Sequence, residues 1–241
     1  MAYSKLLFAT PNAAQLLCFT KETRLNMTPE SFEGAMARPV EELQDSLNYM
    51  AGTIPSSWEF VDVVFLLSDV SRATAQQITR TRNASFAMQS LRVVDATELG
   101  YENPFDEDFQ PELYHQFDEQ VHQSKLAYTM LLDKGAAPQD ARGVLPLNIY
   151  CNLVAKYNLR AFVELCQKRE SMRTQGEYAD LVVQMKKQVL DVWPWAAAFF
   201  VPKHKAAIEM LEEVVRLTGM EVGKGQGWQI AKAIDLLRAD K

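Results

Sequence analysis

Three arginines, two serines and one glutamine lie within the thirteen residues from Arg80 to Arg92. The segment reads Arg-Thr-Arg-Asn-Ala-Ser-Phe-Ala-Met-Gln-Ser-Leu-Arg, in a chain whose formal net charge is −6. Guanidinium groups bind phosphate through two parallel, charge-assisted hydrogen bonds. The segment therefore indicates a pocket for a small anion, and the alternative is a solvated basic helix end.

A second polar group follows later in the chain. On a helix, residues 158, 162, 165 and 169 lie near one face, so Asn158 and Arg169 are expected on the same side while Phe162 and Leu165 pack. The alternative is a helix with ordinary surface arginines. The members of the group are Arg142, Asn158, Arg160, Arg169, Gln175 and Glu177.

The histidines do not complete a catalytic template. His115, His122 and His204 lie away from both arginine groups in the sequence, and no Ser/His/Asp or Cys/His grouping is evident. His115 and His122 are seven residues apart on one predicted helix, which is more typical of a surface than of a metal site. We therefore expect no metal.

Two further motifs are interpreted as parts of the fold rather than as sites. The run from Gly223 to Gly227 lacks the GK[ST] ending of a phosphate loop and is interpreted as a turn between helices. Trp193 and Trp195, with Phe199 and Phe200, are expected in the core or in a subunit contact.

Composition limits the compartment and the partners. Cys18, Cys151 and Cys166 form no CxxC pair, which predicts neither a disulfide framework nor a zinc site and favours a reducing, cytoplasmic compartment. A pI near 5.2 argues against binding a nucleic-acid polymer but leaves mononucleotides open. The apolar run from Leu6 to Ala9 is too short for a membrane span, so no membrane partner is expected.

The sequence predicts both helices and strands around these residues, but they do not alternate as regular βαβ units. This pattern predicts the α+β class. Ser71 or Asp69 is expected to cap the short helix before Arg80. Helices are predicted over 11–24, 40–50, 71–78, 111–134, 158–169, 175–192, 203–217 and 227–237. Strands are predicted over 6–9, 59–68 and 91–94, with an extended apolar stretch over 144–150.

These residues, taken in order, resemble a known family. Gln77, Arg80 and Arg82, followed after seven residues by Ser90 and then by Arg92, are similar to the signature of the flavin-dependent thymidylate synthases, which is Arg-His-Arg, seven residues, Ser. The similarity runs from about Lys5 to Phe200. Its other pieces are Ser56–Glu59, Val70–Ala73, Ala141–Pro146, Asn158–Arg160, Arg169 and Glu177.

The resemblance implies a fold, an assembly and a reaction. The fold would be a central, mostly antiparallel sheet flanked by helices in residues 1–202, with a C-terminal helical extension in residues 203–241. The protein would be a homotetramer with active sites where subunits meet. It would bind FAD, and NADPH and 5,10-methylenetetrahydrofolate would serve as co-substrates in methylating dUMP at C5 to dTMP, a step of nucleotide biosynthesis.

The resemblance also implies roles for individual residues. Arg169 would contact the uracil and favour its ionised form, which removes the need for an enzyme nucleophile because positive charge stabilises the ring anion. The flavin would carry the redox step. The residues implied to hold dUMP are Gln77, Arg80, Ser90, Arg92, Arg142 and Arg169. The residues implied to contact FAD are Ser56, Arg80, Thr81, Arg82, Asn158 and Arg160.

The chain departs from the family pattern at its histidines. Thr81 stands at the central histidine of the signature, and the usual Gly-His and Glu-His pairs read Gly52-Thr53 and Glu59-Phe60. Met88, Glu164 and Arg173 replace other polar family residues. Two alternatives therefore stay open: a pyrimidine deoxynucleotide C5 hydroxymethylase or methylase, acting on dUMP or dCMP, and an inactive nucleotide-binding homologue.

Overall fold

A computed structural model describes residues 2–21, 27–170, 174, 176–202, 204–222 and 225–239. Several predicted positions lie outside these ranges: Arg24, Arg173, Gln175, Lys203, Gly223 and Lys224.

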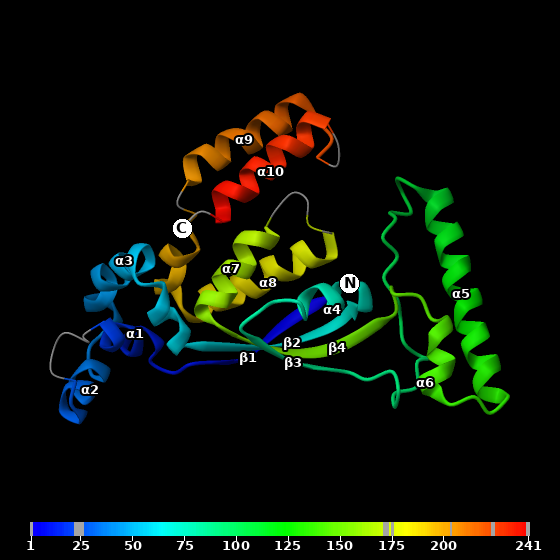
Figure 1. The fold of residues 1–241 in the computed structure, drawn as a ribbon, viewed down its shortest axis with the longest axis horizontal. Helices are drawn as coiled ribbons and strands as arrows, with labels where there is room; N and C mark the ends of the chain where they lie inside the picture. Colours follow the sequence, from blue (N-terminus) through cyan, green and yellow to red (C-terminus); the bar gives the residue numbers. More distant parts are fainter. Residues whose placement is uncertain are drawn as a thin grey trace. The chain divides into compact units, whose positions relative to one another are not determined.

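Four strands form one sheet, drawn in Figure 1, in the order β1, β2, β4, β3. Backbone hydrogen bonds join the end of one strand to the start of its neighbour: Thr10 donates to the Asp62 carbonyl (3.0 Å) and Leu159 to the Val61 carbonyl (2.9 Å). The sheet is antiparallel, and the predicted α+β class is confirmed. The strands are β1 (Tyr3–Ala9), β2 (Asp62–Ser71), β3 (Ala84–Met88) and β4 (Tyr150–Asn158).

The chain divides into two compact units, and all four strands contribute residues to both. Unit 1 contains residues 1–3, 66–80 and 86–155, and unit 2 contains residues 4–65, 81–85 and 156–241. The boundary predicted after residue 202 stays a prediction.

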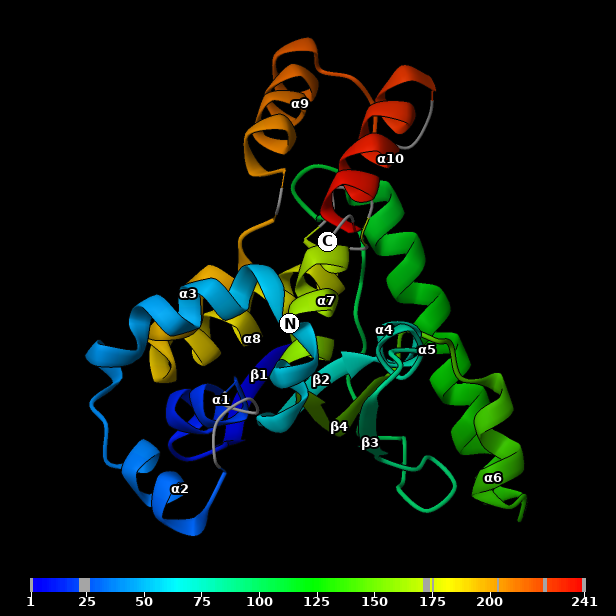
Figure 2. The same ribbon diagram turned by 60° about the vertical axis from the view of Figure 1, so that its left-hand side comes forward.

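Unit 1 is built around a long helix that the sequence predicts closely. Helix α5 begins at Pro111 and ends at Asp133, and Gly135 follows with φ 85°, a conformation that glycine adopts without strain. Figures 1 and 2 show α6 beside α5. Tyr128 of α5 is buried with Leu91, Ala96 and Ala141. The helices of this unit are α4 (Arg72–Ile78), α5 (Pro111–Asp133), α6 (Pro138–Ala141) and the 3-10 helix η4 (Arg142–Val144).

Ser71 confirms the predicted cap of α4, because its side chain accepts the Thr74 backbone N–H at 3.1 Å. The strand predicted over 91–94 is wrong. The backbone N–H groups of Val93 and Val94 both donate to the Ser90 carbonyl (3.2 and 3.1 Å), which closes a turn. The extended stretch predicted over 144–150 is also wrong for most of its length, since Val144 ends η4 and a turn precedes β4.

Unit 2 places its helices around its own core. Helices α7 and α8 contact each other, as α9 and α10 do (Figure 1). The predicted core role of Trp195 and Phe199 is confirmed: they are 7% and 1% exposed, and their rings meet edge to face. The remaining elements are α1 (Ala13–Lys21), α2 (Pro29–Met36), η2 (Val40–Leu43), α3 (Gln44–Thr53), η3 (Pro55–Phe60), α7 (Leu159–Arg169), α8 (Gly176–Val192), η5 (Pro194–Phe200), α9 (Lys205–Thr218) and α10 (Gly225–Ala239).

The two last helices are fixed to the rest of unit 2 by Arg238. Its guanidinium group donates to a Glu212 carboxylate oxygen of α9 at 2.5 Å and to the Glu170 carbonyl that follows α7. The C-terminal segment is therefore helical, as predicted, and it contacts α7.

Three general features bear on the chemistry. Cys18, Cys151 and Cys166 are free and buried. Within the described ranges, no three histidine, cysteine or acidic side chains are grouped so that they could hold a metal ion. Among the described helices, none has the length and apolar character needed to cross a membrane.

Candidate active site

Two predicted arginines lie in the turn between α4 and β3. Arg80 and Arg82 are exposed, and within the described part of the chain neither guanidinium group has a hydrogen-bond or ion-pair partner. The Arg80 backbone N–H donates to the Gln77 carbonyl at 3.3 Å, and Asn83 takes a positive φ of 58° before the strand begins. Asparagine tolerates this conformation, so the turn holds both cations in solvent.

A second pair of arginines is joined in unit 1 by Gln139. The Arg92 Nη2 donates to Gln139 Oε1 at 3.0 Å, and the Arg142 Nε donates to the Gln139 carbonyl at 3.2 Å. Ser90 stands at the turn that presents Arg92, whose backbone N–H donates to Ser90 Oγ at 3.3 Å. Because both acceptors on Gln139 are neutral, the two guanidinium groups keep their full charge.

Asn158 and Arg160 lie at the start of α7 in unit 2. Asn158 Oδ1 accepts the Ala161 backbone N–H at 2.8 Å and caps the helix. Arg160 is bound to two carboxylates, Glu164 at 3.2 Å and Glu59 at 2.8 Å. The hydrogen bonds to Glu164 and Glu59 raise the pKa of Arg160. The Arg160 charge is therefore largely compensated, unlike that of Arg92 or Arg142.

Arg169 ends α7 and lies over an aromatic ring. Its guanidinium carbon is 4.8 Å from the ring centroid of Tyr178 in α8. Burial raises the pKa of the Tyr178 phenol, and the Arg169 charge and the Thr81 hydroxyl lower it in part. Thr81, Arg169 and Tyr178 thus form one cluster within unit 2.

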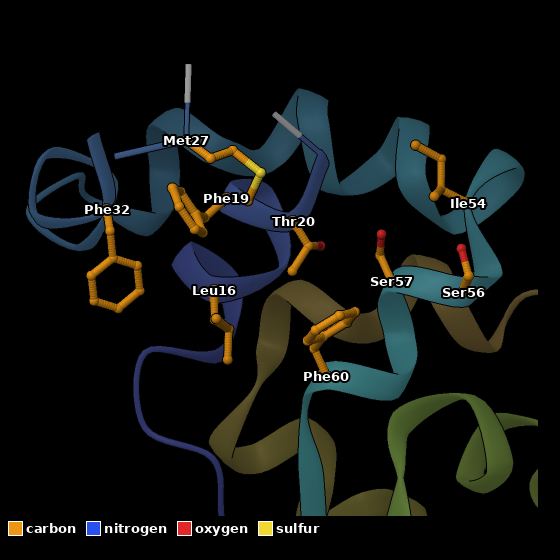
Figure 3. A pocket seen from close by; sticks show the side chains of 9 residues that line it. All are labelled: Leu16, Phe19, Thr20, Met27, Phe32, Ile54, Ser56, Ser57 and Phe60. Atoms are coloured by element: carbon orange, nitrogen blue, oxygen red, sulfur yellow. The ribbon is translucent and has the colours of Figure 1, made fainter. Parts of the chain in front are cut away.

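Ser56 belongs to 3-10 helix η3 and lines a cavity of about 380 Å³ in unit 2. Figure 3 shows Ser56, Ser57 and Phe60 of η3 on one side of it, with side chains of α1 across from them. Phe60 is 61% exposed. The other lining residues are Leu16, Phe19, Thr20, Met27, Phe32 and Ile54.

A family model described as "Thymidylate synthase complementing protein" matches residues 5–195. The chain belongs to this family, that of the flavin-dependent thymidylate synthases. The relative in Nitratidesulfovibrio vulgaris named "Flavin-dependent thymidylate synthase" is 30% identical over 77% of this chain and 82% of its own length. A relative of the same name in Haloarcula marismortui is 26% identical over 79% of this chain and 91% of its own.

The fold is shared with a solved structure. The UMP/dUMP methylase PolB from Streptomyces cacaoi, bound with 5-Br dUMP, superposes with a TM-score of 0.66 at 19% identity. The match covers 83% of this chain and 96% of that one. Helices α9 and α10 lie beyond the residues that the family model matches.

The two compact units divide the positions that this thymidylate synthase family implies. The residues implied for dUMP lie in unit 1 except Arg169, and those implied for FAD lie in unit 2 except Arg80. The structure brings Ser90, Arg92 and Arg142 together. It also places Thr81 and Arg169 near the same residue, Tyr178, although the sequence implied a cofactor role for one and a substrate role for the other. The individual roles stay predictions.

Sequence reasoning missed three groups that contact the predicted residues. Gln139 was not considered, although it precedes Arg142 by three residues, the spacing of one helical turn. The binding of Arg160 by Glu59 spans 101 residues, and no local pattern signals it. Tyr178 directly follows the predicted Glu177, but it belongs to no pattern of polar residues that would mark it as a site residue.

The residues present fit a flavin nucleotide of the kind that the family's name implies. Arg82 offers a free guanidinium group within the described residues, and Ser56 offers a hydroxyl at a cavity with aromatic walls. Arg160 must first leave Glu59 and Glu164. The side chains of Arg160, Glu59 and Glu164 are 34–46% exposed, so each ion pair stabilises the protein by roughly 0–1 kcal/mol. A phosphate group can therefore displace either carboxylate from Arg160.

Replacing Gln139 with glutamate will weaken nucleotide binding. In the Gln139→Glu variant a carboxylate takes the place of the neutral acceptor on Arg92, so it competes with phosphate for the cation. We expect the dissociation constant for dUMP to rise about tenfold, roughly 1.4 kcal/mol. Isothermal titration at low salt measures this, with Gln139→Met as the uncharged control. Equal affinities of the two variants would contradict the assignment.

Freeing Arg160 from one carboxylate will strengthen flavin binding. The Glu164→Gln variant keeps the side-chain shape but removes the charge that now pairs with Arg160. We expect FAD to bind about threefold more tightly at low salt, in line with an exposed ion pair. Quenching of flavin fluorescence measures the affinity. Glu209→Gln, which removes the partner of Lys205 at the same i,i+4 spacing, is the matched control, and a gain shared by both variants would refute the local effect.

Proposed function

We propose that this protein transfers a one-carbon unit from 5,10-methylenetetrahydrofolate to C5 of dUMP and forms dTMP. The reaction depends on FAD, with NADPH as the reductant, and takes place in a cytoplasmic homotetramer. Two kinds of finding support the proposal: membership of the family, whose relatives carry the name flavin-dependent thymidylate synthase, and the geometry of the arginines.

The arginine pair held by Gln139 is the observation that carries the proposal. Two uncompensated guanidinium groups, from Arg92 and Arg142, share one neutral residue in a protein of net charge −6. Such a pair suits a dianionic phosphate monoester, which accepts parallel hydrogen bonds from guanidinium. A nucleoside monophosphate supplies that group together with the ring on which the chemistry occurs.

Arg169 supplies the second charge that the reaction needs. Attack by C5 requires the pyrimidine ring to be electron-rich, and a guanidinium group beside the ring stabilises the negative charge on N3 and the carbonyl oxygens. Arg80, Arg82, Asn158, Arg160 and Ser56 would hold the flavin, which supplies the redox chemistry when bound. No side-chain nucleophile is needed on the pyrimidine.

The direct test is an assay of the purified protein with FAD, dUMP, 5,10-methylenetetrahydrofolate and NADPH. We expect an absorbance band near 450 nm, as oxidised flavins show, and a product with the mass of dTMP. A protein that cannot be reconstituted with flavin, or that yields no dTMP, would refute the proposal.

A variant reaction is the second candidate, and the replaced histidines favour it. Thr81 lies beside Tyr178 and Arg169 where the family signature has a histidine, and the exposed Phe60 stands where its Glu-His pair ends. The same assay, run also with dCMP, separates the candidates, because a hydroxymethyl product is one oxygen heavier than a methyl product. Binding of dUMP without any turnover would instead identify an inactive homologue.

In the proposed homotetramer, we expect each active site to combine residues of different subunits. Val93, Phe109 and Met130 of unit 1 are 85%, 84% and 58% exposed, so these apolar side chains are available for a subunit contact. Arg92→Ala and Arg169→Ala should each lose activity more than tenfold alone. When the two variants are co-expressed, about a quarter of the sites in randomly mixed tetramers should regain both arginines. Mixed tetramers that stay inactive would place both arginines of a site in one subunit.

A further inference from the structure

Arg169 differs from most of the described arginines in the kind of side chain that it contacts. The described arginines that pair with side chains mostly contact carboxylates or amides, but Arg169 lies 4.8 Å from the ring centroid of Tyr178. Tyr178 is 1% exposed, whereas Arg169 keeps part of its surface accessible. The ring is therefore a fixed surface, and the guanidinium group is the mobile partner.

The Tyr178 ring is held by its surroundings. It lies in α8, which contacts α7, and the buried Tyr157 and Cys166 interact with its phenol. Thr81, in the segment before β3, lies near the same phenol, whose oxygen has no hydrogen-bond partner among the described residues. A ring held from several sides fixes the plane of any cation that lies over it.

This contact fixes the direction of the guanidinium group without consuming its charge. An aromatic face attracts a cation by about 0.5–2 kcal/mol but accepts none of the in-plane N–H hydrogen bonds that a carboxylate would take. The N–H groups of Arg169 that do not face the Tyr178 phenol thus stay available to an anion. An arginine side chain also carries about 2 kcal/mol of rotamer entropy, part of which the ring removes before any ligand binds.

We propose that Tyr178 is a positioning residue for Arg169, whose ring fixes the guanidinium plane so that its N–H edge meets the pyrimidine anion. This inference rests on the proposed function, since it concerns how Arg169 acts on the nucleotide. Tyr178 acts only through Arg169 and touches no reacting atom. Thr81, where the family signature has a histidine, lies near the phenol and adds no second titratable cation beside Arg169.

The test compares three substitutions in the tetrameric holoenzyme. Tyr178→Leu removes the ring, Tyr178→Phe keeps it, and Tyr49→Leu removes the ring that the Lys21 ammonium group contacts at 4.6 Å, a pair that includes none of the predicted site residues. We expect Tyr178→Leu to lower kcat for dUMP about tenfold with a smaller change in KM. Tyr178→Phe should stay within about threefold of the wild-type rate, and Tyr49→Leu should leave it unchanged.

A double-mutant cycle separates positioning from a purely structural role. In an Arg169→Lys background the planar cation is already lost, so Tyr178→Leu should then change kcat less than about twofold. Additive losses would overturn the proposal, as would a Tyr178→Phe variant as impaired as Tyr178→Leu or a fully active Tyr178→Leu. If Tyr178→Leu fails to fold, Tyr178→Met takes its place in the cycle, since methionine adapts to the space of the ring.

The outcomes distinguish the inference from the proposed function. Wild-type protein that neither binds dUMP nor forms dTMP would refute the function whatever the Tyr178 variants do. Wild-type protein that forms dTMP, with unchanged Tyr178→Leu kinetics, would refute the positioning role alone.

Discussion

Positive charge must be held in fixed directions without being neutralised, and the predicted site depends on this constraint. The chain is acidic overall, so carboxylates are the most available partners for its arginines. A carboxylate fixes a guanidinium group firmly but cancels its charge and occupies its N–H edge. Gln139 and the ring of Tyr178 avoid this cost, because an amide oxygen, a backbone carbonyl and an aromatic face are all neutral. Arg92, Arg142 and Arg169 are thereby oriented as cations that still attract an anion.

Local folding brings these neutral partners into place. The turn that the Ser90 carbonyl closes directs Arg92 toward α6, and α6 passes directly into η4, so Gln139 and Arg142 lie one helical turn apart. In unit 2 the amide of Asn158 starts α7, and the eleven residues of that helix set where Arg169 ends it. Phe162 and Leu165 of α7 are buried, 0% and 4% exposed, which fixes the rotation of the helix and hence the side from which Arg169 leaves it. The site geometry thus follows from caps and turns that the sequence encodes locally.

Local patterns explain which parts of the fold the sequence could predict. Helix α5 has 23 residues between a proline and a glycine, and its ends were found within one residue. Strand β4 was missed, although Cys151, Leu153, Ala155 and Tyr157 alternate as buried residues, because small and sulfur-containing side chains give a weak strand signal. Helix α2 was missed as well, since its short sequence contains a proline, a glycine and few apolar residues.

The candidate site could be predicted from the sequence only in part, because the partners of its residues lie far away in the chain. Arg92, Arg142 and Arg169 were predicted as site residues from the order of residue types and from the family resemblance that this order carries. Their partners were not predictable, since Gln139 lies 47 residues from Arg92 and Glu59 lies 101 residues from Arg160. Whether a guanidinium group faces an amide, a ring or a carboxylate is decided by such long-range contacts. The charge available to a ligand is therefore a property of the fold rather than of the motif.

Arg160 differs from the arginines implied to hold dUMP in the charge of its partners. Arg92, Arg142 and Arg169 have neutral partners, whereas Arg160, implied to contact the flavin, is paired with Glu164 and Glu59. Glu164, which replaces another polar residue of the family, is one of these two carboxylates. Thr81 stands where the family has a histidine and adds no charge beside Arg169. Neither replacement gives Arg92, Arg142 or Arg169 a carboxylate partner, so the neutral contacts of these three arginines leave their charge available to an anion.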